Sequence, residues 1–332
     1  MSAKPAAAAT NPSASRRSSG EALRLGFGTA ALATALLLSV GTARAGEPDA
    51  VARGEYVFRA AGGCSCHTDI AKGGAFLTGG RALKTPFGVF YSPNITPDPE
   101  TGIGRWSDHD FVGAMREGVA PDGSHYFPVF PYPSFTRMAD RDLLDLKAYL
   151  FSLTPVRKPN RDHDLKPPFG WRFTVGVWKW LYFEPGPYRP EPARSGIWNR
   201  GAYLATALGH CGECHTPRDL LGGLKTRLMF AGSRQGPERQ LAPNITPDKA
   251  TGIGRWRASD ITYLLHTGFK PDGDDVQGLM SEIIEEGFRH LSDADLKAIA
   301  EYLLSLPPIH NELERKRPRP EPEPEPDFEF DF

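Results

Sequence analysis

The sequence is poor in cysteine and has no excess of either charge. Only four of its 332 residues are cysteines, and they form two tight pairs, each followed directly by a histidine: Cys64 with Cys66, and Cys211 with Cys214. This grouping argues against an ordinary disulfide framework. The formal net charge is −1, so no global basic field favours nucleic acid, and we expect no nucleic-acid partner. No strand alternation of useful length occurs, and the 35 glycines and 31 prolines predict short elements joined by many turns.

The chain also lacks a clear membrane span near its N-terminus. The apolar stretch from Leu25 to Val40 is shorter than the roughly 18 to 20 residues that a span needs. Arginines precede it and Ala43-Arg44-Ala45 follows it, which is typical of a secretory signal. We therefore predict a signal peptide over residues 1–45, with an uncleaved anchor as the alternative. The mature chain is expected in the periplasm, either free or associated with the inner membrane.

An internal repeat runs through the rest of the sequence. Pro-Asn-Ile-Thr-Pro-Asp occurs at 93–98 and again at 243–248. Thr-Gly-Ile-Gly-Arg-Trp occurs at 101–106 and returns unchanged at 251–256. Repetition at this spacing indicates two similar units, each of about 110 residues.

Each unit is expected to consist of helices and loops. Amphipathic patterns predict helices over 108–117 and 258–267. A second helix closes each unit, beginning at Asp140 in the first and at Asp293 in the second, where Ser292 is the expected N-cap. The sequence therefore predicts an all-α fold with two tandem domains.

Segments of different composition surround these units. The connector between them is rich in proline and aromatic residues, among them Trp171, Trp178 and Trp180, and is expected to pack across both domains. Since Trp and Tyr suit half-wet apolar surfaces, a membrane-interface or partner-docking patch is the alternative. The C-terminal alternation of charged residues with proline cannot bury enough surface to fold alone. The expected order is signal peptide 1–45, first domain 48–158, connector 159–192, second domain 193–308 and disordered tail 309–332.

The second cysteine pair has the spacing of a covalent haem site. Cys211-Gly212-Glu213-Cys214-His215 is a C-x-x-C-H sequence, in which two thiols can add to the vinyl groups of haem while the imidazole ligates iron. A zinc site would need four ligands, and a redox C-x-x-C would need no histidine. Haem attachment is therefore the hypothesis we adopt for Cys211, Cys214 and His215.

The first pair departs from this pattern by one residue. Cys64-Ser65-Cys66-His67 is C-x-C-H, and alignment of the two histidines puts Gly63 where the first thiol is expected. We expect haem here too, held by His67 and by a thioether from Cys66, with Cys64 either strained into a second bond or free. The competing interpretation is an emptied haem domain with a reactive dithiol.

These motifs, together with Phe130-Pro131-Tyr132-Pro133-Ser134-Phe135 and Leu291-Ser292-Asp293-Ala294-Asp295-Leu296, resemble class I cytochrome c domains. In particular they resemble the cytochrome subunits of periplasmic, membrane-associated alcohol and gluconate dehydrogenases, over about residues 48 to 308. The resemblance implies two covalently bound haems c and a role in electron transfer rather than catalysis. It also implies a dehydrogenase catalytic subunit as donor, and quinone, a small cytochrome or an oxidase as acceptor.

The resemblance also suggests the second axial ligand of each iron. Met280 stands where family members place the axial methionine, and core packing is its alternative. In the first domain Met138 is the preferred ligand, with His125 as the second choice. Met115 corresponds to Leu265 in the other repeat and is expected to pack in the core.

Other repeated residues have two readings. Asn94 with Asn244 and Arg105 with Arg255 could bind haem propionates, and Trp106 with Trp256 could wall the haem pocket; turn and core chemistry explains them equally well. The remaining histidines do not recur at matching places and are expected at the surface or at helix caps, His163 and His210 among them.

A haem enzyme is the rival from another functional class. A dihaem peroxidase or a thiosulfate-oxidising cytochrome would keep an open or unusual coordination site, and the irregular first domain suits that reading. An open site would bind carbon monoxide readily, which separates this rival from an electron carrier.

Overall fold

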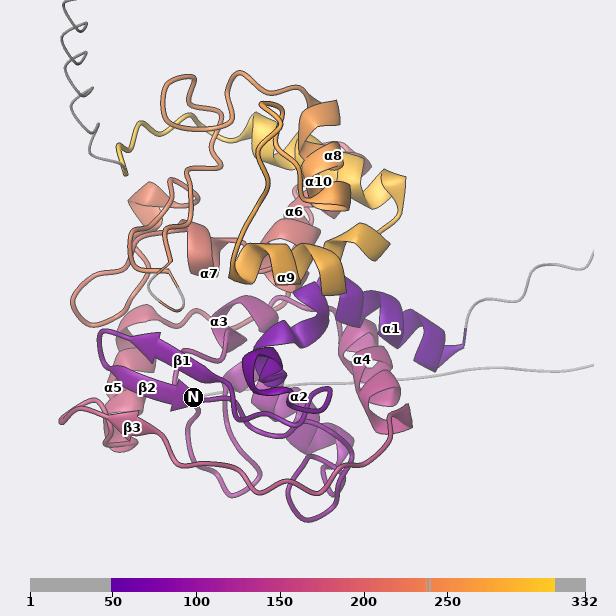
Figure 1. The fold of residues 1–332 in the computed structure, drawn as a ribbon, viewed down its shortest axis with the longest axis vertical. Helices are drawn as coiled ribbons and strands as arrows, with labels where there is room; N and C mark the ends of the chain where they lie inside the picture. The colour runs from indigo at the N-terminus through magenta and orange to yellow at the C-terminus, as the bar shows by residue number, and fades with distance from the viewer. Residues whose placement is uncertain (1–48, 237, 239, 314–332) are drawn as a thin grey trace, which may run out of the picture. The chain divides into compact units, whose positions relative to one another are not determined.

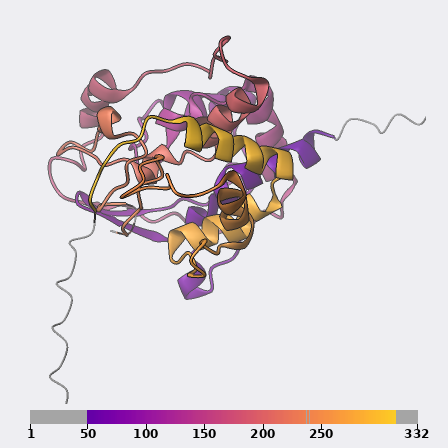
Figure 2. The same ribbon diagram turned by 90° about the horizontal axis from the view of Figure 1, so that it is seen from above.

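The computed structural model describes residues 49–236, 238 and 240–313 (Figure 1, and from above in Figure 2). The predicted signal peptide lies outside the described residues, as does most of the predicted tail. The described residues belong to one compact unit, whose first half (49–192) and second half (193–313) each contain one of the sequence repeats.

The helices of the first half follow the expected pattern. The amphipathic helix and the closing helix occupy the predicted residues, and Ser107 and Asp110 cap the former reciprocally. The helices are α1 (Ala50–Ala60), α2 (Asp108–Glu117), α3 (Tyr132–Phe135), α4 (Asp140–Ser152) and α5 (Phe173–Tyr182), with short 3₁₀ segments η1 (Gly62–His67) and η2 (Ile70–Lys72).

The second half repeats this order. The hydroxyl of Ser292 accepts a hydrogen bond from the Asp295 backbone N–H, which confirms the predicted N-cap of the closing helix. The helices are α6 (Gly196–Tyr203), the π-helical η3 (Leu204–Leu208), α7 (Gly212–His215), η4 (Thr226–Leu228), α8 (Ala258–Thr267), α9 (Leu279–Glu286), η6 (Phe288–His290) and α10 (Asp293–Ser305).

In each half the first helix packs closely on the closing helix, α1 on α4 and α6 on α10 (Figure 1). A glycine permits the approach in both places, because a Cβ on Gly54 would collide with the Asp145 carbonyl and one on Gly201 with the Ala298 carbonyl. Arg53 binds Asp145 across the first contact, and Arg200 binds Asp295 across the second. The sequence repeat therefore produces the same pair of packed helices in each half.

The expectation of an all-α fold was wrong in one respect, since the helix-rich structure also contains a small antiparallel sheet. Its order is β1 (Ala82–Thr85), β2 (Gly88–Tyr91), β3 (Asp164–Leu165). β1 and β2 form a hairpin, and β3 comes from the predicted connector and pairs through Gly88 with Leu165. Strands of two to four residues are too short to show a period of two, so the sequence did not reveal them.

The two halves share one apolar core, which includes Phe58, Leu143, Leu204 and Leu296. The end of α10 is followed by residues that stay attached to the second half. The carbonyl of Ile309 accepts from the Asn244 side chain at 2.8 Å, and Asn311 donates to the Ala231 carbonyl at 2.9 Å. These bonds lie where the tail was expected to begin.

Candidate haem sites

Both histidines of the cysteine motifs are held in the same way. The Nδ1 atom of His67 lies 2.8 Å from the Pro93 carbonyl oxygen, and that of His215 lies 2.7 Å from the Pro243 carbonyl oxygen. A carbonyl can only accept, so Nδ1 carries the proton and the Nε2 lone pair is left for a metal. Burial lowers the pKa of both imidazoles, which favours this neutral form. The two prolines open the repeated Pro-Asn-Ile-Thr-Pro-Asp motif, and this contact is one function of that motif.

His67 lines a cavity of about 840 Å³ in the first half. Cys64 and Cys66 line it as well. Their surroundings differ: Cys64 packs against the shared core, whereas Cys66 packs against a small cluster between the sheet and α5. Much of the remaining wall is apolar and includes Leu83, Phe90, Trp106, Phe111, Met115, Phe127, Phe130, Phe135, Leu146, Leu150 and Val175.

Packing explains why a glycine stands at position 63. His67 follows Gly54 by 13 positions and His215 follows Gly201 by 14, and the π-helix η3 takes up the additional residue. The first half lacks this additional residue, so Gly63 occupies the position that corresponds to Cys211 in the second half. A Cβ at this position would lie 2.7 Å from the Glu286 carbonyl oxygen of α9, and φ there is +66°. The approach of α9 excludes cysteine at position 63.

The chain turns sharply before the displaced cysteine. Gly62, Gly63 and Cys64 have consecutive positive φ values of 76°, 66° and 47°. Cysteine rarely adopts this conformation, so the segment holds Cys64 under backbone strain. None of the four cysteines forms a disulfide. Burial raises the pKa of Cys66 to about 11 and that of Cys64 to about 12, and so keeps both thiols protonated.

The second attachment segment lies on α7 and borders the first cavity. His215 is 8 % exposed. His210, Glu213 and Cys214 all line the cavity of the first half. Burial, with the Cys66 thiol as a smaller cause, raises the pKa of Cys214 to about 12. The two cysteine motifs, separated by about 150 residues in the sequence, thus share a wall.

The proposed axial methionines have different environments. Met280 lies on α9, partly buried against the core. Met138 is fully buried, and its carbonyl accepts from Arg116 at 2.8 Å, but it is not among the residues that line the cavity of His67. Met115 packs in the core as expected and also lines that cavity. His125 contacts Lys179 at 2.9 Å and does not line it either.

The side chains of the repeated asparagines hydrogen-bond to loop residues and not to a ligand. The Asn94 amide nitrogen donates to the Thr101 hydroxyl and the Val156 carbonyl, while its oxygen accepts from Thr96. Asn244 makes the corresponding bonds in the second half. Arg105 and Arg255 are exposed, and Trp106 lines the first cavity and packs against the core.

Polar residues of the connector complete the first cavity, although no sequence pattern indicated them. Asn160, Arg161, His163 and Arg172 line it, so the expectation that His163 and His210 are surface or capping residues was wrong. His163 Nδ1 accepts from the Tyr91 backbone N–H at 3.1 Å, which leaves its Nε2–H as a donor. No periodic signal marks these residues; only their position in a polar stretch beside β3 connects them.

The donor set of the first cavity suits haem. Broad apolar walls match a flat macrocycle, Arg161, His163 and Arg172 match its carboxylates, and His67 with the cysteines matches its iron and vinyl groups. No cluster of three or more His, Cys, Asp or Glu side chains suited to a bare metal ion occurs in the part of the chain that the structure describes. The helical fold and these sites define a c-type haem protein.

Comparison with known proteins identifies the family. No protein-family model matches the chain. A protein named dihaem cytochrome c-type from Cereibacter sphaeroides is 42% identical over 273 residues, which cover 80% of this chain and 88% of that relative. The chain therefore belongs to the family of dihaem c-type cytochromes, electron-transfer proteins whose cofactors are two covalently bound haems c. The predicted resemblance and its two haems are confirmed.

Other relatives are parts of dehydrogenases. The fructose dehydrogenase cytochrome subunit of Gluconobacter japonicus is 40% identical over 259 residues, and the gluconate 2-dehydrogenase cytochrome c subunit of Pantoea cypripedii is 38% identical over 264 residues. Each match covers 77% of this chain, and the chain spans 52% of the former relative and 59% of the latter. Both relatives are named as cytochrome subunits, which agrees with the expectation of an electron carrier.

Proposed function

We propose that the chain carries single electrons from the catalytic subunit of a periplasmic dehydrogenase to the respiratory chain. The acceptor is quinone, a small cytochrome or an oxidase. The names of the fructose and gluconate dehydrogenase relatives support the donor. When bound, each haem supplies the one-electron couple of its iron.

The shared wall between the two attachment segments carries this proposal. Cys66 and Cys214 both line the first cavity, so the two cysteine motifs lie next to each other. A relay between two haems depends on this proximity. Buried apolar residues of both halves form one core beside these motifs.

The side chains then have the following proposed roles. His67 and His215 are the proximal ligands, and their Nδ1 bonds to Pro93 and Pro243 fix the ring orientation. Met138 and Met280 are the proposed distal ligands. Cys211 and Cys214 form two thioethers, while Cys66 forms one. Arg161 and Arg172 would neutralise the carboxylates at the first site, and His163 would donate to them through its Nε2–H.

Haem attachment is tested on protein matured in a periplasm. Intact mass and a pyridine haemochrome spectrum report the number of haems and of saturated vinyl groups. We expect two haems, with Cys64→Ser keeping both and Cys66→Ser losing the covalent haem of the first half. Cys211→Ser serves as the reference for loss of one of two thioethers. If the mass of the wild-type protein shows a single haem, bound to Cys211 and Cys214, the proposal of a two-haem relay is wrong.

Ligand binding tests the carrier against the enzyme. A carrier with two six-coordinate irons should take up two electrons per chain in a redox titration and bind little carbon monoxide. Rapid carbon monoxide binding with a high-spin spectrum would overturn the proposal in favour of catalysis at an open first site.

The proposed location is the periplasmic face of the inner membrane. In the residues that the structure describes, no helix is long and apolar enough to cross a membrane. Fractionation of cells expressing the full chain tests the compartment, and recovery in the cytoplasm would contradict it.

A further inference from the structure

Helix α5 buries one side and exposes a broad apolar face. Val175 is 3 % exposed and packs with the sheet. On the other side Phe173 is 72 % exposed, Val177 58 %, Trp180 83 % and Leu181 48 %. These positions follow one another at helical spacing and so share one face. Among the described residues nothing covers this face.

Two neighbouring segments enlarge the face. Trp171 stacks on Phe173 with ring centroids 5.9 Å apart. The Trp178 indole N–H donates to the Leu221 carbonyl at 3.1 Å and ties the following loop to α5, with Leu220 left 93 % exposed. We call the combined area the outer α5 surface; it consists of Trp171, Phe173, Val177, Trp180, Leu181, Leu220 and Leu221.

The outer α5 surface is continuous with the first haem cavity. Val177, Leu181 and Leu221 line that cavity as well as the surface. Any partner that covers the surface therefore also covers an edge of the cavity. Seven large apolar side chains in one area exceed the scattered apolar exposure of an ordinary surface and mark an interaction site.

The charge around this surface indicates the partner. Residues 157–182 contain six Lys or Arg and two Asp, although the whole chain has a net charge of −1. Arg161, Lys166 and Arg172 are exposed. Exposed Trp and Phe on one helix face, with basic residues beside them, are the combination by which peripheral helices bind anionic lipid.

We propose that the outer α5 surface binds the surface of an anionic lipid bilayer. The aromatic rings enter the headgroup region, and Lys166, which is exposed and does not line the first cavity, approaches the lipid phosphates. The edge of the first haem cavity then faces the bilayer. This inference specifies the surface behind the proposed membrane location and does not depend on the direction of electron flow.

Vesicle flotation of the full-length holoprotein, matured in a periplasm, tests the inference. One set of vesicles contains phosphatidylethanolamine and phosphatidylglycerol, and the other contains phosphatidylcholine alone. The variant carries Phe173→Ser and Trp180→Ser, two exposed residues that do not line the cavity. We expect binding to the anionic vesicles, weakened by added salt, and a loss of about tenfold or more in the variant.

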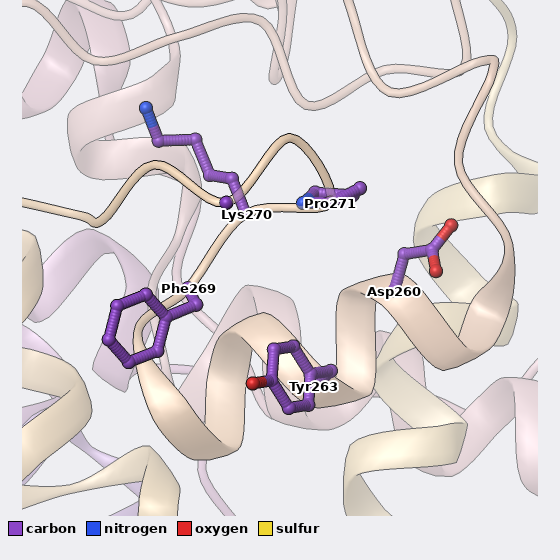
Figure 3. Close-up of a pocket in the computed structure, with 6 residues that line it drawn as sticks. Asp260, Tyr263, Phe269, Lys270 and Pro271 are labelled. Atoms are coloured by element: carbon purple, nitrogen blue, oxygen red, sulfur yellow. The ribbon is translucent and has the colours of Figure 1, made fainter.

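The second half provides a matched control. Tyr263 and Phe269, at α8 and the turn after it, are 54 % and 47 % exposed beside a shallow surface pocket (Figure 3). Tyr263→Ser with Phe269→Ser removes a comparable pair of exposed rings and should bind vesicles like the wild type. Lack of wild-type binding to anionic vesicles, or equal binding by the α5 variant, overturns the inference. Haem content measured on the same samples separates this failure from a failure of the electron-transfer proposal.

Discussion

The Ser134 hydroxyl donates a hydrogen bond of 2.7 Å to Glu213 Oε1. Ser134 lies on α3 of the first half, whereas Glu213 stands between the two cysteines of the second attachment segment. The other carboxylate oxygen binds Arg218. Nearby, the ring of Phe135 packs edge-on against His210 with centroids 5.3 Å apart. The second cysteine motif is therefore bonded directly to α3, and Phe135 of this helix lines the first cavity.

Removal of the Ser134 hydroxyl tests this connection. Ser134→Ala leaves Glu213 Oε1 without its donor in a partly buried place, so we expect the free energy of unfolding to fall by about 1 to 2 kcal/mol. Denaturant titration of the holoprotein measures it. The control is Ser259→Ala on the exposed side of α8, which should change stability by less than about 0.5 kcal/mol. An unchanged Ser134→Ala protein would show that the bond contributes nothing.

The glycines between paired helices should be intolerant of substitution. Gly54→Ala and Gly201→Ala each place a methyl group against a backbone carbonyl, so we expect a loss of about 3 kcal/mol in each half. Gly113, inside α2, has no atom within 4 Å of its Cβ position. Gly113→Ala should therefore be neutral or stabilise the protein by about 0.5 to 1 kcal/mol. Thermal unfolding compares the three variants, and equal melting temperatures would contradict the packing argument.

Asp295 should make stability depend on acid pH. Burial raises its pKa, but hydrogen bonds from Arg200 and Tyr56 outweigh burial and lower the pKa below its ordinary value of 3.8. Such a carboxyl contributes stability above its unfolded pKa and loses that contribution as pH falls through the lower, folded value. The stability difference between wild type and Asp295→Asn should thus shrink below pH 3.8. A difference that stays constant on acidification would refute this.

Methionine variants test the distal ligands. Met280→Leu and Met138→Leu should each abolish the sulfur–iron absorption of one oxidised haem and lower its reduction potential, because methionine opposite histidine raises the potential. Met115→Leu should leave both spectra unchanged. If Met115→Leu loses the sulfur–iron absorption of the first haem and Met138→Leu keeps it, the distal ligand of that haem is Met115, which lines the cavity.

The sequence by itself determined the features that depend on neighbouring residues. Helix periodicity and capping placed α2, α8 and both closing helices at their observed positions, since these signals act within one or two turns. The cysteine motifs and the repeat likewise identified both histidines. Family membership then followed from the same residues.

Only the tertiary structure decided how the halves meet. Gly63 replaces a cysteine because α9, more than 200 residues later, packs against it. His163 and Arg172 reach the first cavity because β3 pairs with β2 about 75 residues before it in the chain. Which methionine faces the cavity also depends on such packing. Contacts between residues far apart in the chain leave no periodic pattern in the sequence. The local pattern of each segment reflects its own helix or strand and is the same whether or not the distant segment packs against it.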